Sequence, residues 1–325
     1  MTKAMRLLIV ILSILVLLTS CARPMPIKVP DPTSAPTEET NTPTQPPTEV
    51  PTESPTETTL PAKPAMTASE LYQKVRGATG GTRANQYSQT TRANIRVGAD
   101  GVFLRTESTT TKRVILSGMP CTVNVETESF AKSMDMEIEQ LLHEYYRLEN
   151  GKMVLYYYID TLELYGKEIL DVDPYDVLMG FSVAEFSYFE PDNLALAEEP
   201  EELEGKEVYA LSYTIPLWYF TGTTGDTQTD TLLQDQHVLH TCYVDAETFL
   251  PLQIEASFSE VDESLADLLM LTYGNVYAED LESVEIQINE LTITAKDMVF
   301  EPVEVPAIPE EVLQGIDTSV NYIAA

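Results

Sequence analysis

Hydrophobic and polar residues alternate along most of the chain after residue 80, and this period of two predicts antiparallel strands. Residues 87–97 and 102–110 flank Gly98-Ala-Asp-Gly101, a tetrad typical of a tight turn, so they form the first predicted hairpin. Asp245-Ala-Glu-Thr248 marks a second turn of this kind. The other predicted strands are 114–116, 122–128, 194–197, 208–215, 239–244, 249–258 and 284–300.

Helical spacing of apolar residues occurs at a few places in the chain. Residues 67–75, TASELYQKV, place Leu71, Tyr72 and Val75 on one face of an amphipathic helix with Ser or Thr as its N-cap. Gly80-Gly81 ends this helix. The other predicted helices begin at Asp173-Pro174, span 259–273 and begin at Pro309.

The segment EYYRLENGKMVLYYYID predicts the best-defined hairpin. Asn150-Gly151 favours a type I′ turn, because both residues accept a positive φ angle. A two-residue loop pairs Glu149 with Lys152 and thereby sets the register of the whole hairpin. One face then carries Leu142, Tyr146, Leu148, Met153, Leu155 and Ile159, and the other carries His143, Tyr145, Arg147, Val154, Tyr156 and Tyr158.

The first face of this hairpin is apolar and the second is tyrosine-rich and amphipathic, so we expect a sheet covered on one side and half-exposed on the other. A curved sheet over a ligand cavity gives this pattern, and so does a plain sheet packed against a helix. In the first interpretation, Tyr146, Leu148, Met153 and Leu155 contact the ligand. In the second, they are ordinary core residues.

The N-terminus has the features of a lipoprotein signal. After a basic start, residues 7–18 form an apolar run with one polar residue, which is the length of a signal-peptide core. Leu18-Thr-Ser-Cys21 resembles the bacterial lipobox, in which the cysteine thiol receives a diacylglycerol and becomes the new N-terminus. An ordinary signal peptide with a chance cysteine is the alternative. The lipobox interpretation makes residues 1–20 a signal peptide and Cys21 a membrane anchor, held by about 0.8 kcal/mol per buried CH₂.

Residues 21–66 predict a disordered stalk between this anchor and a folded domain at 67–325. Pro, Thr and Glu dominate the segment, aromatic residues are absent, and PTEE, PTEV, PTES and PTET are near-repeats. Proline favours extended polyproline II, so at about 3.1 Å per residue the stalk could reach roughly 140 Å. A long stalk after a lipobox suggests a Gram-positive type of envelope.

Charge is distributed unevenly along a chain whose formal net charge is −33. Residues 67–113 hold eight Lys or Arg and three Asp or Glu, whereas residues 114–325 hold six and 43. Such an acidic body disfavours nucleic acid and anionic membrane surfaces as partners. The basic part can pair with the acidic remainder inside the fold.

Cys121 and Cys242 are the cysteines that follow the anchor. Outside the cytosol they can form a disulfide, which would close a loop of about 120 residues and add about 4–5 kcal/mol. Two separate buried thiols are the alternative.

His240 and Cys242 share a strand face, but at this spacing they lie roughly 6–7 Å apart. That is too far for a nucleophile–base pair.

Motifs for catalysis or metal binding are missing from the sequence. Asp171-Val-Asp-Pro-Tyr-Asp176 lacks the glycine and the glutamate of a calcium loop. Gly180-Phe-Ser-Val-Ala184 lacks the final glycine of a nucleophile elbow. No P-loop, Rossmann turn or zinc ribbon occurs. We therefore expect no metal, no cofactor and no enzymatic activity.

The order of these parts resembles a known superfamily. A lipobox and linker precede the helix ASELYQKV, long strands follow, and YVDAETFLPLQIEASF and a terminal IPEEV complete the pattern over roughly residues 67–313. In this pattern the chain resembles bacterial lipoproteins of the LolA-like and LppX-like superfamily. The resemblance implies an α+β fold, a curved antiparallel half-open β-barrel with helices packed on or plugging its concave face. It also implies an apolar cavity that holds acyl chains.

Together these observations predict a non-enzymatic lipoprotein anchored to the outer face of the bacterial cell membrane through diacylglyceryl-Cys21. Its expected ligand is a lipid or another amphiphile in a cavity between sheet and helices. The alternative is an accessory protein of the envelope that the stalk presents to a protein partner and that has no small-molecule ligand.

Overall fold

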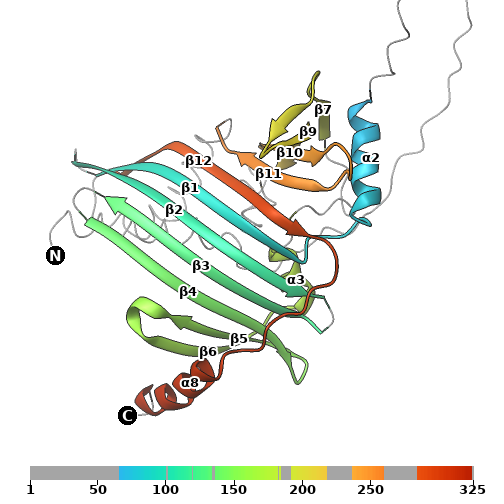
Figure 1. Ribbon diagram of the computed structural model, residues 1–325. Coiled ribbons are helices and arrows are strands. Elements are labelled where there is room, and N and C mark those ends of the chain that lie inside the picture. Colours follow the sequence, from blue (N-terminus) through green and yellow to red (C-terminus); the bar gives the residue numbers. More distant parts are fainter. Residues whose placement is uncertain are drawn as a thin grey trace, which may run out of the picture.

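The computed structural model describes residues 66–99, 102–118, 120–133, 136–181, 183, 192–217, 236–259 and 284–323. Within these residues, twelve strands form one antiparallel sheet on which helices pack (Figure 1). The helices are α2 (Ala68–Ala78), the short 3-10 helix η1 (Asp160–Leu162), α3 (Pro174–Gly180) and α8 (Glu310–Ile323). The strands are β1 (Gln86–Ala99), β2 (Val102–Ser117), β3 (Thr122–Ser133), β4 (Met136–Glu149), β5 (Lys152–Ile159), β6 (Leu164–Leu170), β7 (Asp192–Leu196), β8 (Glu201–Leu203), β9 (Lys206–Pro216), β10 (His237–Asp245), β11 (Pro251–Ser257) and β12 (Val284–Val299).

The sheet consists of two meanders joined at its middle. Its order is β6-β5-β4-β3-β2-β1-β12-β11-β10-β9-β7, with β8 paired to β9. The first and last strands, β1 and β12, are therefore neighbours. β6 and β7 lie at opposite ends of this order, so the sheet is not closed. The fold is the curved, half-open antiparallel barrel with helices that the resemblance implies.

The N-terminal helix forms where the apolar spacing predicts it. Thr67 is its N-cap: the Thr67 hydroxyl accepts a hydrogen bond from the Glu70 N–H at 3.2 Å, and the Glu70 carboxylate accepts one from the Thr67 N–H at 2.8 Å. These bonds lower the pKa of Glu70 below its ordinary value, because they favour the ionised form. Leu71, Tyr72 and Val75 are buried against the sheet, as expected.

The predicted hairpin at Asn150-Gly151 is confirmed in turn and in register. Asn150 has φ 51° and Gly151 has φ 78°. Glu149 pairs with Lys152, and the pairs continue in step to Leu142 and Ile159. The predicted turn at residues 245–248 is also present. The Asp245 carboxylate accepts hydrogen bonds from the N–H groups of residues 247 and 248 there. Glu204 and Gly205, both with positive φ, form a further turn between β8 and β9.

Three strands differ from the expectation, and one of them is β8, a strand of three residues that pairs with β9 and is not predicted. β2 is one continuous strand, although the pattern predicts two separate runs, because its central residues TESTTTKR contain no large apolar side chain. Threonine is β-branched and forms strands readily, and this segment pairs with β1 on one side and β3 on the other. β6 is not predicted at all. Among the described residues, its seven positions pair with β5 alone, at the end of the sheet.

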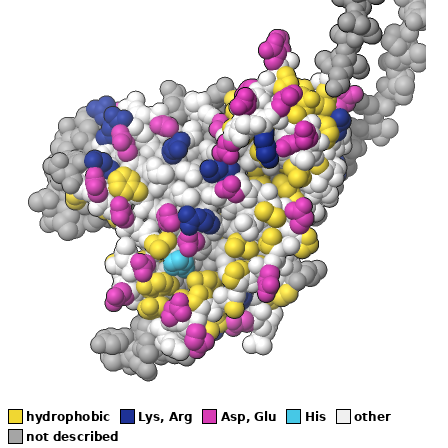
Figure 2. All heavy atoms as spheres, in the orientation of Figure 1, with side chains coloured by type: hydrophobic (Ala, Val, Ile, Leu, Met, Phe, Trp, Pro, Cys, Tyr) yellow, Lys and Arg dark blue, Asp and Glu magenta, His cyan; other side chains and the backbone are white. Residues whose placement is uncertain are grey.

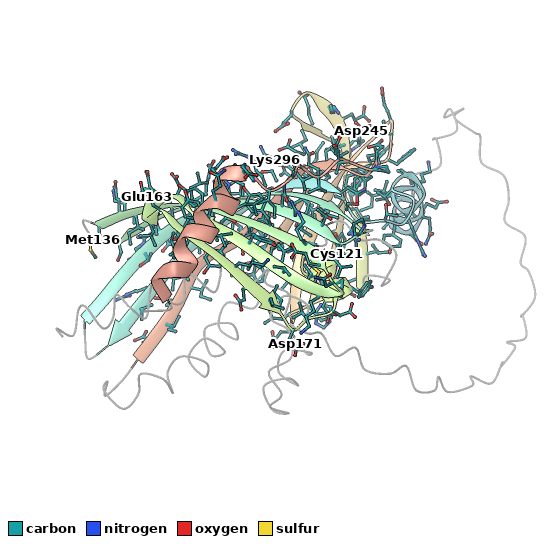
Figure 3. The ribbon with its side chains drawn as sticks, turned by 90° about the horizontal axis from the view of Figure 1, so that it is seen from below. Cys121, Met136, Glu163, Asp171, Asp245 and Lys296 are labelled. Atoms are coloured by element: carbon teal, nitrogen blue, oxygen red, sulfur yellow. The ribbon has the colours of Figure 1, made fainter. Side chains whose placement is uncertain are left out.

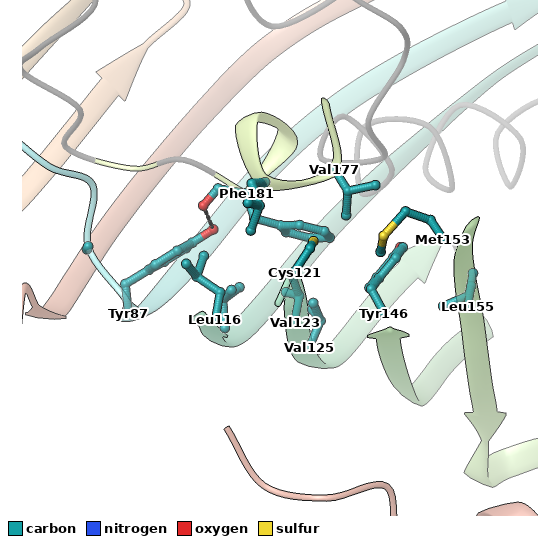
Figure 4. Close-up of a cluster of buried hydrophobic side chains, with 13 residues drawn as sticks. Tyr87, Leu116, Cys121, Val123, Val125, Tyr146, Met153, Leu155, Val177 and Phe181 are labelled. Carbon is teal, nitrogen blue, oxygen red and sulfur yellow. Dashed lines mark hydrogen bonds between the residues drawn. The ribbon is translucent and has the colours of Figure 1, made fainter. Parts of the chain in front are cut away.

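One face of the sheet, called here the inner face, packs against α2 and α3. Phe181 and Val177 of the α3 segment cover the β2–β5 side in a cluster that includes Leu116, Val123 and Tyr146 (Figure 4). Within this cluster, the Tyr87 hydroxyl donates a hydrogen bond of 2.8 Å to the Phe181 carbonyl. Helix α2 covers the β9–β11 side in a second cluster. The apolar core therefore lies at one end of the long strands.

The opposite face, called here the outer face, is covered at the hairpin by the C-terminal helix. Val312 and Ile316 of α8 pack on Tyr145, Val154 and Tyr156, which are all buried. Figure 3 shows α8 lying across the strands on this side. The expectation that this face is half-exposed is therefore wrong at these residues, because a helix from the far end of the chain returns to bury them.

A segment of extended chain carries β12 to α8 across the outer face. The Pro306 carbonyl accepts hydrogen bonds from Asn124 at 2.9 Å and from Arg147 at 3.0 Å. Arg147 also donates to the Val123 carbonyl at 3.1 Å. These contacts fasten the segment to β3 and β4 and so place α8 on the sheet.

Residues 1–65, 218–235 and 260–283 lie outside the described residues. The predicted signal peptide, the anchor Cys21, most of the stalk and most of the helix expected at 259–273 fall in these ranges. In the part of the chain that is described, no helix is both long enough and apolar enough to cross a membrane.

Candidate functional site

Buried polar side chains occupy the middle of the inner face, beyond the apolar core. Strand register brings them together from three neighbouring strands: Lys112 of β2 pairs with Thr127 of β3, and Thr110 of β2 pairs with Ser129 of β3. Each of these side chains points to the same face because residues two apart along a strand share a face. We call the following buried residues the polar band: Thr91, Thr106, Thr110, Lys112, Thr127 and Ser133.

Hydrogen bonds account for only part of the polar band. The Thr110 hydroxyl donates to the Ser129 hydroxyl at 3.3 Å, and the Ser133 hydroxyl donates to the Arg105 carbonyl at 3.2 Å. The hydroxyls of Thr106 and Thr127 have no hydrogen-bond partner among the described residues, although the two residues are only 2% and 6% exposed. Native structures seldom leave buried hydroxyls unsatisfied, so these two are candidates for contact with a bound polar group.

Apolar side chains border the polar band on the side of β12. Ile95 of β1 pairs with both Thr106 and Ile288, so a threonine and two isoleucines lie in one row across three strands. In the next row inward, Leu291 of β12 pairs with Ala93 of β1. Ile95, Ile288, Leu291 and Ala93 are all buried. Buried polar and buried apolar side chains therefore lie side by side on the inner face.

A buried carboxylate lies next to the polar band. Glu144 of β4 is buried, and its Oε1 accepts a hydrogen bond of 3.1 Å from the Tyr146 hydroxyl. Glu144 pairs across the strands with Val125, one row from the Lys112–Thr127 pair. The inner face thus holds one buried basic and one buried acidic side chain, Lys112 and Glu144, on strands that β3 separates.

The four residues predicted to contact a ligand are not placed together around one site. Tyr146, Met153 and Leu155 are buried in the core cluster with the α3 segment (Figure 4). The Tyr146 ring contacts Phe181 edge-on at 5.2 Å between centroids. Leu148 is 39% exposed near the turn of the hairpin. At these positions, the structure shows the arrangement of a sheet packed against a helix, which is the second interpretation of the sequence pattern.

Cys121 and Cys242 are free, buried thiols in the structure. Cys121 belongs to the cluster beneath α3, and its Sγ lies 3.5 Å from the Pro174 carbonyl. Cys242 belongs to the cluster beneath α2. Burial raises the pKa of Cys121 to about 11 and that of Cys242 further, so both thiols stay protonated and poorly nucleophilic at neutral pH. The sequence left open a Cys121–Cys242 disulfide or two separate thiols, and the structure has two separate thiols.

His240 is a core residue of β10 on the inner face. Its ring stacks on Tyr213 at 5.3 Å between centroids. Burial lowers the pKa of His240 to about 4, because the apolar surroundings disfavour the imidazolium. His240 is thus neutral at pH 7. Among the described residues, no group of three or more His, Cys, Asp or Glu side chains is placed to hold a metal ion.

Sequence reasoning missed the polar band. Its members lie in stretches such as STTTKR, which alternate too weakly to show which side faces inward. One signal was present: Lys112 follows Thr110 at a spacing of two, immediately before the apolar positions 114 and 116 of the same strand face. Period-two arithmetic from those apolar residues would have placed Lys112 and Thr110 on the inner face.

The sequence matches no protein-family model and no curated protein. Among solved structures, LprF from Mycobacterium bovis is similar over 74% of this chain and 96% of its own, with 12% identity and a TM-score of 0.34. A putative outer membrane lipoprotein-sorting protein domain from Vibrio parahaemolyticus is similar over 79% and 100%, with 9% identity and a TM-score of 0.26. A DUF1329 family protein from Desulfovibrio piger is similar over 74% and 96%, with 10% identity and a TM-score of 0.23. These remote likenesses concern the fold, and the function is inferred from the chain's own residues.

Proposed function

We propose that this chain is a membrane-anchored binding protein of the cell envelope that holds an amphiphilic ligand on the inner face of its open sheet. Cys21 carries the diacylglyceryl anchor, residues 21–66 form the stalk, and residues 67–325 form the binding domain. The protein performs no chemistry on its ligand. The candidate contacts are the polar band for the polar part of the ligand and the apolar surface of β12 for its apolar part.

The observation that carries this proposal is that two buried hydroxyls of the inner face, those of Thr106 and Thr127, are unsatisfied, and that Thr106 lies beside buried apolar side chains. Leaving a buried hydroxyl without a partner costs about 1–3 kcal/mol. Thr106 lies six residues from Lys112, the partner of Thr127, so the two hydroxyls are about 20 Å apart and a polar group of the ligand satisfies one of them. An apolar segment beside a polar group at Thr106 would pack among the buried Ile288 and Leu291. A purely apolar ligand would leave the hydroxyls unsatisfied, and a fully polar one would place polar groups against the buried apolar side chains of Ile288 and Leu291.

The proposed ligand is tested on a chain with Cys21→Ser, which cannot be acylated, so that every lipid found is bound without a covalent bond. Native mass spectrometry of this protein, purified without detergent, is followed by extraction with organic solvent. We expect a bound mass that disappears on extraction and returns when the extract is added back. The proposal is contradicted if the unextracted protein already has the mass of the bare polypeptide and takes up no added phospholipid or fatty acid. In that case the hydroxyls contact buried water.

The site of binding is tested with Thr127→Val, which keeps the shape of the side chain and removes its hydroxyl. The variant should bind the extracted ligand about tenfold more weakly, consistent with the loss of one hydrogen bond to a buried group, of order 1.5 kcal/mol. Thr109→Val is the matched control, because Thr109 lies exposed on the outer face of the neighbouring strand. Equal affinities of the two variants would place the ligand elsewhere.

The anchor is tested separately from the ligand. In its native host, the wild-type chain should fractionate with membranes and carry a diacylglycerol mass on an N-terminal Cys21, whereas the Cys21→Ser variant should be released from them. Membrane retention of the variant would show that the lipobox interpretation is wrong and leave the binding domain untouched.

A second candidate function, a docking module for a protein partner, is favoured by one observation. Several exposed large apolar side chains lie along the β5–β6 hairpin at the free end of the sheet, including Leu162 at 67% exposure, Leu164 at 45% and Ile169 at 63%. Edge strands that expose such residues are ready to pair with another strand. The test is to replace Ile169 with a charged residue. If the variant still takes up the ligand but no longer co-purifies with a protein partner, this candidate is favoured.

A further inference from the structure

Strand β4 extends six residues beyond β5, the strand that flanks it on one side. Its pairing with β5 ends at Leu142 and Ile159, whereas its pairing with β3 continues to Met136. The chain leaves β5 through η1 and turns back at Glu163, which has φ 46°, to form β6. Among the described residues, positions 136–141 of β4 are therefore paired on the β3 side alone. We call this stretch the β4 edge.

Strand register shows which backbone groups of the β4 edge point away from the sheet. Residues that face each other on antiparallel strands alternate between hydrogen-bonded and non-hydrogen-bonded pairs, and the pair that closes a two-residue turn is hydrogen-bonded. Glu149 and Lys152 close the turn between β4 and β5, so every second residue counted back from Glu149 points its N–H and C=O to the β5 side. In the β4 edge these residues are Glu137, Glu139 and Leu141. The residues between them bond to β3.

The side chains of the β4 edge alternate between apolar and acidic. Met136 and Ile138 lie on the inner face and are 40% and 41% exposed, whereas Tyr146 of the same strand and face is 1% exposed. Glu137 and Glu139 lie on the outer face and are exposed. An edge that combines outward N–H and C=O groups with exposed apolar side chains is a template for an added strand.

Negative charge collects at the β4 edge. Glu137 Oε1 lies 2.7 Å from Lys132 Nζ, and both side chains are more than half exposed, so solvent screens this pair. Glu139, Asp160 and Glu163 are exposed, and they take part in none of the ion pairs within the described part of the chain. Asp160 belongs to η1, which contacts β4. Figure 2 shows Asp and Glu side chains spread over the outer face.

We propose that the β4 edge binds an extended segment of a partner protein in which apolar and basic residues alternate. The backbone of the segment bonds to the N–H and C=O groups of Glu137 and Glu139. Residues opposite each other on paired strands share a face, so the residue opposite Glu139 is a lysine or an arginine on the outer face. Its neighbours lie with Met136 and Ile138 on the inner face and are apolar. This interaction uses the edge of the sheet and does not depend on an amphiphilic ligand.

Two other occupants fit the β4 edge less well. A second copy paired about a two-fold axis centred on Glu137, Ile138 or Glu139 would set a glutamate opposite a glutamate, and like charges in this position destabilise a sheet. The stalk at 21–66 carries the same sign of charge, and its prolines have no N–H to donate. A basic segment from another protein meets neither obstacle.

The test uses the full chain with Cys21→Ser and three capped heptapeptides. One alternates valine and lysine, one alternates valine and glutamate, and the third is the valine–lysine peptide with every backbone amide N-methylated. Calorimetry should detect saturable binding of the first peptide and none of the other two. Equal binding of the N-methylated peptide would show attraction between charges without strand pairing. That result, or no binding of the first peptide, overturns the proposal.

Hydrogen exchange locates the bound peptide on the unchanged strand. The N–H groups of Glu137 and Glu139 should exchange rapidly in the free chain and slowly once the valine–lysine peptide is bound. The N–H groups of Ile138 and Gln140, which face β3, should exchange slowly in both states. Slow exchange at Glu139 in the free chain would show that another segment of the chain or a second copy already pairs with the edge, and would contradict the proposal.

Variants separate the contribution of the backbone from that of the charge. Glu139→Gln removes one carboxylate and should weaken binding about threefold, as expected for an exposed ion pair. Glu139→Pro also removes an outward N–H, while the bonds to β3 remain, and should weaken binding at least about tenfold further.

Lys167→Pro is the matched control, because by the same count it removes an outward N–H from β6 at the end of the sheet. It also removes a positive charge, so it should bind the peptide at least as tightly as the wild type. Weaker binding by Lys167→Pro with unchanged binding by Glu139→Pro would place the peptide on β6 and overturn the site.

Discussion

Protonation of His240 should make the fold sensitive to moderate acid. Burial on the inner face lowers the pKa of His240 from 6.5 to about 4. In the unfolded chain the imidazole titrates near 6.5, so between pH 6.5 and 4 the unfolded state binds more protons than the native state. Stability must therefore rise with pH in this window and fall as the solution is acidified.

The size of this effect follows from the shift itself. A shift of about 2.5 pH units at about 1.36 kcal/mol per unit corresponds to roughly 3 kcal/mol, present above pH 6.5 and lost by pH 4. That is a substantial part of the 5–15 kcal/mol that typically holds a domain together. Carboxylates also titrate at the acid end of this range, so the contribution of His240 has to be isolated by difference.

The assay is urea denaturation of the wild type and of His240→Phe at pH 7, 6, 5 and 4. Phenylalanine keeps an aromatic ring against Tyr213 but binds no proton. The difference in unfolding free energy between the two proteins should change by roughly 3 kcal/mol between pH 7 and pH 4, in favour of the variant at low pH. Cys242→Ala on the same strand face controls for a loss of packing without titration, and should run parallel to the wild type. Parallel curves for His240→Phe and the wild type would refute the reasoning.

Three further changes test the packing that shapes the domain. Gly166→Ala should cost about 1–3 kcal/mol, because its Cβ would overlap the ring of Tyr157, and Tyr157→Ala in the same chain should recover part of this loss in a double-mutant cycle. In Gly315→Val, a Cβ would lie 2.5 Å from Tyr165 Cδ1, so the variant should release α8 from the sheet. Limited proteolysis should then cut the chain after residue 300 faster than in the wild type. An unchanged cleavage rate would contradict the contact. Thr67→Ala removes the N-cap of α2 and should lower the unfolding free energy by about 1 kcal/mol in thermal denaturation. An unchanged unfolding free energy would show that the N-cap does not stabilise the helix.

Local chemistry made much of the fold predictable. The turn at Asn150-Gly151 and the register of its hairpin follow from two residues that tolerate positive φ, because a two-residue loop leaves a single pairing. The start of α3 follows from Asp173-Pro174, and the Asp173 carboxylate does accept a hydrogen bond from the Tyr175 N–H at 2.7 Å. Such turns and caps depend on neighbours within a few residues, so the local sequence is sufficient to predict them.

The candidate site could not be predicted in the same way. Tyr146, Met153 and Leu155 were correctly placed on one apolar face, but the sequence does not say whether a helix or a ligand covers that face. α3 covers it, because its apolar side chains fill the space next to β4 and β5. The polar band was missed for a related reason: Lys112 and Thr127 become neighbours only through the pairing of β2 with β3.

By itself, the sequence determined most strand positions, the turns and the helix caps, since each depends on periodicity or on φ preferences within a short window, whereas the half-open barrel was implied by the resemblance to a known superfamily. Only the tertiary structure decided that β1 pairs with β12, that α8 returns to bury the tyrosines of the hairpin, and that Arg96 faces Arg105. These contacts join residues that are far apart in the chain or on different strands. Their free energy comes from burial and pairing across the sheet, which no local pattern encodes.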